Sequence, residues 1–345
     1  MARGLLRPRA MPAPLHPLLA HPRLARRALL AAPLILAGPA RAAAPSAWPT
    51  RPLRWIVNFP PGGAADTLSR ALGESIGLSL GQPIVIENRP GAGGMLGADL
   101  LAKAPGDAHL VMMSSAASHG IGPVLYPNPP YDPLRDFTHL GLVGSFASVL
   151  VVNPGVPAQG LAEFLALARG RPGGLAYGTG GNGTMNHLVG QLLARAAGVE
   201  LTHVPYRGSA PALADAIGGQ IPAVMESLPI ALPHLRAGRL RPLGTSEAGR
   251  DAATPEVPSF TEAGFPAARS TNWFGFSAAA GLPPEIGARW VAAIRAALQD
   301  PALRARFAGL GVVPGPMDPA AYTALIAGEL ERWRGVIEAA GVKPD

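Results

Sequence analysis

The chain has 345 residues, 48% of them hydrophobic, with 29 Lys and Arg against 22 Asp and Glu, which gives a formal net charge of +7. Seven of the 29 basic residues and no acidic residue lie within residues 1–42, so the rest of the chain has 22 of each and no net charge. This balance argues against nucleic-acid binding through bulk charge, and the absence of cysteine excludes disulfides, thiolate metal sites and a cysteine nucleophile.

Residues 1–42 have the pattern of an export signal. Six arginines lie in residues 1–27, an apolar run covers residues 28–38, and Ala40-Arg41-Ala42 fits a small-residue cleavage site. As a helix the apolar run would span about 16 Å, well short of a hydrocarbon core of about 30 Å, so it does not fit a membrane anchor. We therefore expect an exported protein, and Arg26-Arg27 leaves both the general secretory and the twin-arginine routes open.

The rest of the sequence alternates β-rich runs with helical patterns, which is typical of α/β proteins. The first half predicts a helix at 66–80 with Asp66 as its N-cap, and β-rich runs at 54–59, 83–88, 109–114, 139–144 and 148–153. The second half predicts helices at 161–169, 184–197, 210–217 and 228–237, separated by strands at 175–177, 201–206, 221–226 and 240–245. Two long helices are then expected at 284–310 and 318–340.

The strand–helix–strand pattern occurs twice, which predicts two similar lobes. We expect lobe 1 to combine residues 43–148 with 274–345, and lobe 2 to comprise residues 149–273. The segments 148–153 and 270–278 are apolar and lack the composition of a flexible linker. They are therefore the predicted hinge crossings between the lobes.

Three glycines, Gly178, Gly180 and Gly183, spell G-x-G-x-x-G between a strand and a helix, the pattern of a dinucleotide-binding fingerprint. Such a site needs an acidic residue at the end of the following strand. Here Glu200 begins that strand and Val204-Pro205-Tyr206 ends it. Thr184 fits an N-cap, so the glycines all precede the helix. We therefore expect no nucleotide and no other cofactor. No metal site is expected either, because the histidines after residue 42 (His109, His119, His139, His187, His203 and His234) lack close metal-ligand spacing.

Four predicted strands lead into turns rich in small residues and backbone donors, at residues 59–66, 114–120, 178–184 and 206–212. In the last of these, Ser209 is the expected helix cap, with Pro211 in the first turn. Backbone amides at helix N-termini bind anions, and ligands of open α/β sheets lie at the carboxyl ends of strands. Each turn alone also fits tight strand-to-helix geometry, but the four together predict an anion-binding cleft shared by the lobes.

Five segments strongly resemble the Bug-type receptors, the periplasmic substrate-binding components of tripartite tricarboxylate transporters. They are FPPGGAADTLSRALGE, IVIENRPGAGGMLGADLLAKA, YGTGGNGTMNHLVGQLL, HVPYRGSAPALADAIGGQI and LPHLRAGRLRPLGTSEAGR with TPEVPSFTEAGF after it. The resemblance extends from about Trp48 to the C-terminus.

The resemblance implies a two-lobed, type II periplasmic-binding-protein fold in which each lobe is a Rossmann-like sheet with flanking helices. Such receptors close like a flytrap on a small organic carboxylate and deliver it to membrane permease subunits, without catalysis. We expect this chain to act as a monomer.

The resemblance also implies that main-chain donors and ordered water hold the ligand carboxylates, and it identifies candidate ligand-binding residues in three loops. These are Pro60, Pro61, Gly62, Gly63, Ala64 and Asp66; then Ser114, Ser115 and His119; then Thr179, Gly180, Gly181, Asn182, Gly183 and His187. The sequence departs from the family pattern at several positions. Met225-Glu226 replaces a common Phe-Asp pair, and this change can alter the cleft lining and the choice of ligand.

Four candidate side chains keep two interpretations each. Asp66 is either an N-cap or the partner of a ligand amine, and His187 either donates to a carboxylate or bonds locally. Arg207 is either a bidentate clamp on a carboxylate or a solvated surface residue. Tyr206 forms either a wall of the cleft or part of the core.

Two other functions are weighed against transport. One is a ligand-sensing partner of a membrane signalling protein, which would use the same cleft. The other is an exported serine hydrolase acting through Ser114, Ser115 or the G-x-S-x-G motif at residues 77–81. That motif ends a predicted helix with Gly81 as its C-cap, whereas a nucleophile elbow needs a strand, a sharp turn and then a helix.

Overall fold

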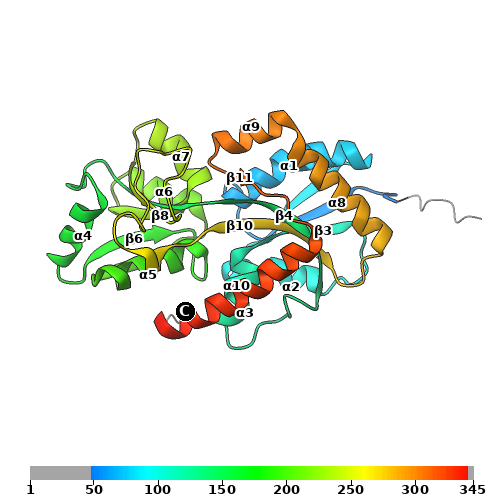
Figure 1. Ribbon diagram of the computed structural model, residues 1–345, viewed down its shortest axis with the longest axis horizontal. Coiled ribbons are helices and arrows are strands. Elements are labelled where there is room, and N and C mark those ends of the chain that lie inside the picture. Colours follow the sequence, from blue (N-terminus) through cyan, green and yellow to red (C-terminus); the bar gives the residue numbers. More distant parts are fainter. Residues whose placement is uncertain (1–47, 341–345) are drawn as a thin grey trace, which may run out of the picture. The chain divides into compact units, whose positions relative to one another are not determined.

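The computed structural model describes residues 48–340, and the predicted export signal lies outside this range. Within it, the chain forms two mixed β-sheets with helices packed against them (Figure 1). The strand order is β11-β4-β10-β3-β1-β2 in the first sheet and β7-β6-β8-β5-β9 in the second. None of the helices in residues 48–340 combines the length and the apolar sequence needed to cross a bilayer.

The first sheet has a parallel half and an antiparallel half. The parallel strands are β1 (Leu53–Val57), β2 (Ile84–Asn88) and β3 (Leu110–Ser115), and the antiparallel ones are β10 (Asn272–Ala279), β4 (Phe137–Phe146) and β11 (Val313–Pro314). Its helices are α1 (Ala64–Leu80), α2 (Met95–Ala102), α3 (Gly122–Leu125), α8 (Pro284–Gln299), α9 (Pro301–Gly309) and α10 (Pro319–Ala340). Two short helical turns, η1 (Ala92–Gly94) and the π-helix η2 (Ala116–Ile121), follow β2 and β3.

The second sheet repeats the arrangement on a smaller scale. Its strands are β5 (Ser148–Val152), β6 (Leu175–Thr179), β7 (Leu201–Pro205), β8 (Ala223–Ser227) and β9 (Arg241–Thr245), with β6 parallel to both β7 and β8. Its helices are α4 (Leu161–Arg169), α5 (Met185–Ala197), α6 (Ser209–Ile217), α7 (Leu228–Arg236) and the short η3 (Pro266–Ala268). Since β6 and β8 run in the same direction, their carboxyl ends meet at one edge.

The chain passes from one sheet to the other at two places. Only Ala147 separates the end of β4 from the start of β5, and residues 246–271 lead from β9 back to β10. The two passages are bonded to each other, since Ser148 N–H donates to Ser246 Oγ at 2.9 Å and Ser246 Oγ donates to the Ser270 carbonyl at 2.6 Å. The predicted lobe boundaries and hinge action stay predictions.

Helix α1 shows which local features the sequence predicts well. Leu68, Leu72, Ile76 and Leu80 recur every four residues and are all buried, as expected of a helix with one apolar face. The helix ends at Gly81, which has the left-handed backbone angles (φ +76°) of a C-cap. The prediction of Gly81 as the C-cap is therefore confirmed.

Three boundary predictions were wrong for identifiable reasons. Asp66 is not the N-cap of α1, because the helix begins two residues earlier and Gly63 occupies the cap position. Ser209 is likewise the first residue of α6 and not its cap, which is Gly208. The helix expected over 284–310 is broken between α8 and α9, because Pro301 lacks an N–H and forces the preceding Asp300 out of helical angles (ψ 122°).

Candidate functional site

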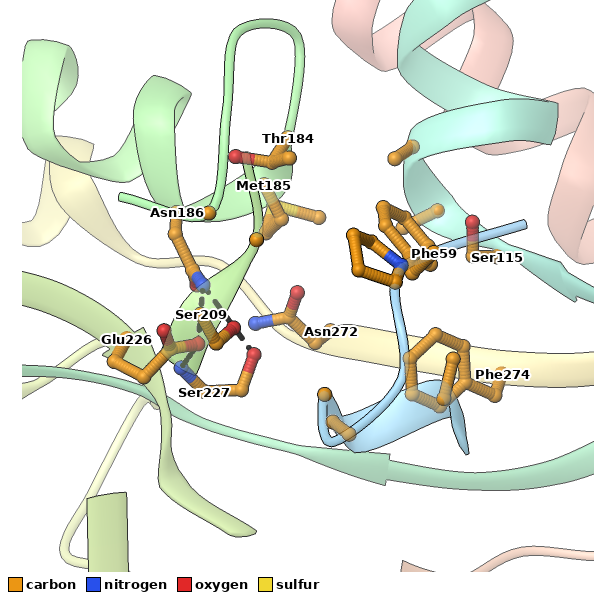
Figure 2. Close-up of a pocket in the computed structure, with 18 of the residues that line it drawn as sticks. Phe59, Ser115, Thr184, Met185, Asn186, Ser209, Glu226, Ser227, Asn272 and Phe274 are labelled. Atoms are coloured by element: carbon orange, nitrogen blue, oxygen red, sulfur yellow. Dashed lines mark hydrogen bonds between the residues drawn. The ribbon is translucent and has the colours of Figure 1, made fainter. Parts of the chain in front are cut away.

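A small cavity of about 60 Å³ lies where the two sheets meet, and both sheets contribute to its lining (Figure 2). By volume it has room for several water-sized groups. The first sheet and its turns supply Phe59, Pro60, Gly63, Ala64, Ala65, Ser115, Ala116, Ala117, Asn272, Trp273 and Phe274. The second sheet and its turns supply Gly180, Thr184, Met185, Asn186, Gly208, Ser209, Glu226 and Ser227.

Four α-helices begin at this cavity. Gly63 and Ala64 start α1, Thr184 and Met185 start α5, Gly208 is the N-cap of α6 and Ser227 is the N-cap of α7. First-turn amides have no acceptor within their own helix, and the helix dipole places a partial positive charge at this end. No Lys or Arg lines the cavity. Hydrogen-bond donors for an anion therefore come from the main chain and from neutral polar side chains of the lining.

The wall formed by the second sheet carries a network of polar side chains. Glu226 Oε1 accepts hydrogen bonds from Asn186 Nδ2 at 3.1 Å and from Ser227 N–H at 2.7 Å. Asn186 Oδ1 and Asn272 Nδ2 both bond to the Ser148 hydroxyl, at 2.6 and 2.8 Å. Figure 2 shows Asn186, Glu226, Ser227 and Asn272 of this network on one side of the cavity, and the rings of Phe59 and Phe274 with Ser115 on the other. The site is thus polar on one side and mainly apolar on the opposite side.

Glu226 is buried, with only 1% of its surface exposed. Burial raises the pKa of its carboxyl group, and the polar groups of Ser227, Ser209 and Asn186 counter this effect only in part. It is the only residue lining the small cavity with an acidic or basic side chain.

A second, larger cavity of about 640 Å³ adjoins the small one and shares Phe59, Pro60, Gly180, Thr184 and Gly208 with it. The turn at residues 90–94 lines it, together with Tyr126, Gly181, Asn182, Pro205, Tyr206 and Arg207. Arg207 is exposed and is the only basic residue in this lining. Tyr206 donates to Asp215 at 2.7 Å, and burial together with that carboxylate raises the pKa of the phenol to about 12.

About half of the residues identified from the sequence line one of these cavities. Those in the small cavity are Pro60, Gly63, Ala64, Ser115 and Gly180, and those in the large one are Pro60, Gly180, Gly181, Asn182, Tyr206 and Arg207. The residues that line neither cavity are Pro61, Gly62, Asp66, Ser114, His119, Thr179, Gly183 and His187.

Asp66 is bonded within its own turn. Its carboxylate accepts from Gly62 N–H at 3.0 Å, from the Arg70 guanidinium at 2.9 and 3.1 Å, and from Asn88 Nδ2 at 3.1 Å. Burial acts to raise the pKa of Asp66, but these bonds outweigh it and the net shift is downward. The side chain therefore fixes the turn between β1 and α1, and its oxygens are already engaged by protein donors.

Ser114 and His119 lie in the core behind the cavity. The Ser114 hydroxyl bonds to Tyr322 Oη at 2.8 Å and accepts from Ser277 at 2.9 Å. The His119 ring is fully buried 4.7 Å from the Phe137 ring, with its Nδ1 bonded to the Ser118 hydroxyl at 2.9 Å. Ser114 lies within β3, where successive side chains point to opposite faces of the sheet, and His119 lies in η2. The lining of the small cavity in this region is Ser115, Ala116 and Ala117.

A second group of predicted residues supports the glycine turn from behind. Thr179 Oγ1 accepts from Gly181 N–H at 3.1 Å and lies 2.7 Å from His203 Nε2. The His187 ring stacks on His203 with centroids 4.1 Å apart, and its Nδ1 accepts from Gly183 N–H at 3.3 Å. Thr184 caps α5 as predicted, since its hydroxyl accepts from His187 N–H.

The polar wall of the small cavity consists of Asn186, Ser209, Glu226, Ser227 and Asn272, and none of these was named as a candidate ligand-binding residue from the sequence. Glu226 was noted there only as part of a departure from the family pattern that can alter the cleft lining. Glu226 and Ser227 end β8, so the rule that ligands lie at the carboxyl ends of strands would have pointed to them. Asn186 and Asn272 had no comparable signal.

Comparison with known proteins gives a consistent set of matches. The family model described as "Tripartite tricarboxylate transporter family receptor" matches residues 68–342. Protein BugT of Bordetella pertussis is 37% identical over 308 residues, which cover 89% of this chain and 94% of that protein.

Two solved structures share the fold and were determined with small acids. A protein of R. palustris solved with adipate is 32% identical, with a TM-score of 0.83 over 86% of this chain and all of that one. MatC from Rhodopseudomonas palustris, with bound malate, is 31% identical, with a TM-score of 0.78 over 84% of this chain and 99% of that one. The expected two-lobed α/β fold of periplasmic binding proteins is thereby confirmed.

Proposed function

Because the chain belongs to the receptor family of tripartite tricarboxylate transporters, we propose that it captures a small organic carboxylate in the small cavity. In this proposal the chain is exported by its N-terminal signal, closes its lobes on the ligand and delivers it to the membrane subunits of a tripartite transporter. It is a solute-binding receptor and not an enzyme, as the family match indicates.

The observation that carries the proposal is the convergence of four helix N-termini, those of α1, α5, α6 and α7, on one cavity without a basic side chain. Main-chain amides in a site with few waters hold a carboxylate more strongly than they would in bulk solvent, because the local dielectric is low. The structures solved with adipate and with malate support the same class of ligand.

The hydrolase alternative has no support in the geometry. The G-x-S-x-G motif at residues 77–81 lies at the C-terminal end of α1, so it lacks the strand that must precede a nucleophile elbow. The hydroxyls of Ser114 and Ser115 bond to Tyr322, Ser277, Ser118 and Asn58, and not to a histidine.

The test is a thermal-shift panel of mono-, di- and tricarboxylates, including adipate and malate, on the exported form of the protein. A ligand at about 100 times its Kd adds about 2.7 kcal/mol to the free energy of unfolding, so at least one acid is expected to raise Tm by several degrees. A panel without any shift would refute the proposed function.

A matched pair of variants tests whether the ligand binds at the cavity. The added Cβ of Gly180→Val would lie 3.3 Å from both the amide nitrogen and the hydroxyl of Ser209, which narrows the cavity. Gly160→Val is the control, because its Cβ would meet open space at the start of α4. We expect the shift to disappear in the first variant and to persist in the second.

A further inference from the structure

The small cavity contains one feature that a simple anion site does not require, which is the carboxyl group of Glu226. Its Oε1 already accepts two hydrogen bonds, whereas Oε2 is buried and makes none. A buried oxygen without a partner costs free energy unless something else satisfies it. Since Oε1 is occupied as an acceptor, Oε2 is the position at which this carboxyl group can carry a proton.

The surroundings of Glu226 supply no positive side chain to balance its charge. The ionisable residues on the helices packed around β8 bond elsewhere: His187 of α5 stacks on His203, Asp215 of α6 accepts from Tyr206, and Arg236 of α7 donates to the Gly309 carbonyl. The remaining ones, Arg195 and His234, lie in the last turns of α5 and α7. Strands β5 and β6 carry no charged residue.

Two carboxylates confined in a small cavity of low dielectric repel each other strongly, and one of them then retains a proton. The four helix N-termini at the cavity offer compensation, but a captured ligand competes with Glu226 for it. Protonation of Glu226 removes the repulsion at once, with the proton taken from solvent. Glu226 Oε2 can carry this proton, because it makes no hydrogen bond to a protein group.

We propose that Glu226 is protonated on Oε2 when the cavity holds a carboxylate, so that ligand capture is coupled to the protonation of this residue. This inference rests on the proposed function, since it needs the carboxylate to lie in the small cavity. It makes Glu226 a residue that selects the charge of the ligand. The neutral carboxyl group admits an anion, whereas an ionised one would admit a cationic group.

The experiment compares the wild-type protein with Glu226→Gln, whose amide reproduces the neutral form of the carboxyl group. Infrared difference spectra are recorded at about pH 8, well above the ordinary glutamate pKa of about 4.3, with adipate as the probe, or malate if only malate stabilises the protein. The wild-type complex is expected to show the carbonyl band of a protonated carboxylic acid, and the Glu226→Gln complex to lack it. Glu200→Gln, at an exposed position, is the control and is expected to retain the band.

Calorimetric titration supplies the second measurement. Glu226→Gln is expected to bind the same acid at least as tightly as the wild-type protein at about pH 8, because it needs no proton. Loss of binding in a folded Glu226→Gln protein would overturn the inference, since it would mean that the ionised carboxylate contacts a cationic group of the ligand. Adipate binding without the infrared band would also overturn it and would leave the proposed function intact. If no acid in the panel stabilised the wild-type protein, the proposed function itself would fail.

Discussion

Gly208 offers a direct test of whether the turns of the two sheets must approach each other for ligand capture. It is the N-cap of α6 and has φ +116°, a backbone conformation that side chains rarely adopt. An added Cβ would lie 3.0 and 3.2 Å from two ring carbons of Pro60 in the turn between β1 and α1. Alanine at this position therefore pushes against the facing turn, and the proline ring has little freedom to yield.

The expected cost of Gly208→Ala has two parts. A residue with a side chain at this φ strains the backbone by about 1–3 kcal/mol, and this part lowers stability with or without ligand. The contact with Pro60 adds overpacking of about 1–3 kcal/mol. If the ligand binds only when the turns at Gly208 and Pro60 are as close as observed, the overpacking destabilises mainly the complex. It then lowers the affinity for the ligand by about 10-fold to 100-fold.

Isothermal calorimetry with the best acid of the panel measures the affinity, and urea unfolding measures the stability. Gly264→Ala is the control for strain, because Gly264 has φ +91° and its Cβ would meet open space. We expect both variants to lose stability and only Gly208→Ala to lose affinity. An unchanged affinity in Gly208→Ala would show that capture does not depend on this approach.

Two further predictions concern the parts that support the site. Thr184→Ala removes the bonds of the hydroxyl to His187 N–H and to the Gly181 carbonyl and is expected to cost about 2 kcal/mol of unfolding free energy in urea. Thr184→Ser keeps the hydroxyl and is expected to lose less than half as much, so equal losses would assign the effect to the methyl group. Burial lowers the pKa of His139 to about 4, so its neutral form stabilises the fold above the unfolded pKa of about 6.5, and this contribution is lost as the pH falls. Between about pH 6.5 and pH 5 the wild-type protein is expected to lose about 1.5 kcal/mol more than His139→Gln; parallel urea profiles would contradict this.

Much of the fold follows from patterns that act over a few residues. The four-residue spacing of apolar side chains located α1, and the caps Thr184 and Gly81 were identified because each satisfies local backbone groups. The break at Asp300-Pro301 was missed because the apolar pattern continues through it. Asp66 was misplaced because an acidic residue stabilises the first turn of a helix as well as its cap.

The site was predicted less completely than the fold, since its wall draws single residues from several elements. In α5, His187 was named as a candidate ligand-binding residue and Asn186 was not. Of these two residues, Asn186 lines the small cavity and His187 does not. Successive residues of a helix point about 100° apart, so the two side chains face different neighbours, and the sequence alone does not fix the rotation of the helix. Asn272 begins β10, far along the chain from the other polar residues of the wall.

Backbone donors and side chains have different roles in the proposed site. This difference explains why family motifs identify the class of ligand more readily than the ligand itself. In the proposed function the glycine and proline turns would hold a carboxylate through amides that every residue type except proline possesses, so they would select the acid group and nothing attached to it. In that proposal, discrimination between ligands falls to the side chains that line the rest of the small cavity, such as Phe59, Met185 and Phe274, and to its one ionisable group, Glu226. These four residues lie outside the glycine turns. Substitutions among them can therefore change which ligand binds, while the backbone donors for the carboxylate stay the same. Exchanging Glu226 is therefore expected to alter which acids bind before it alters whether acids bind.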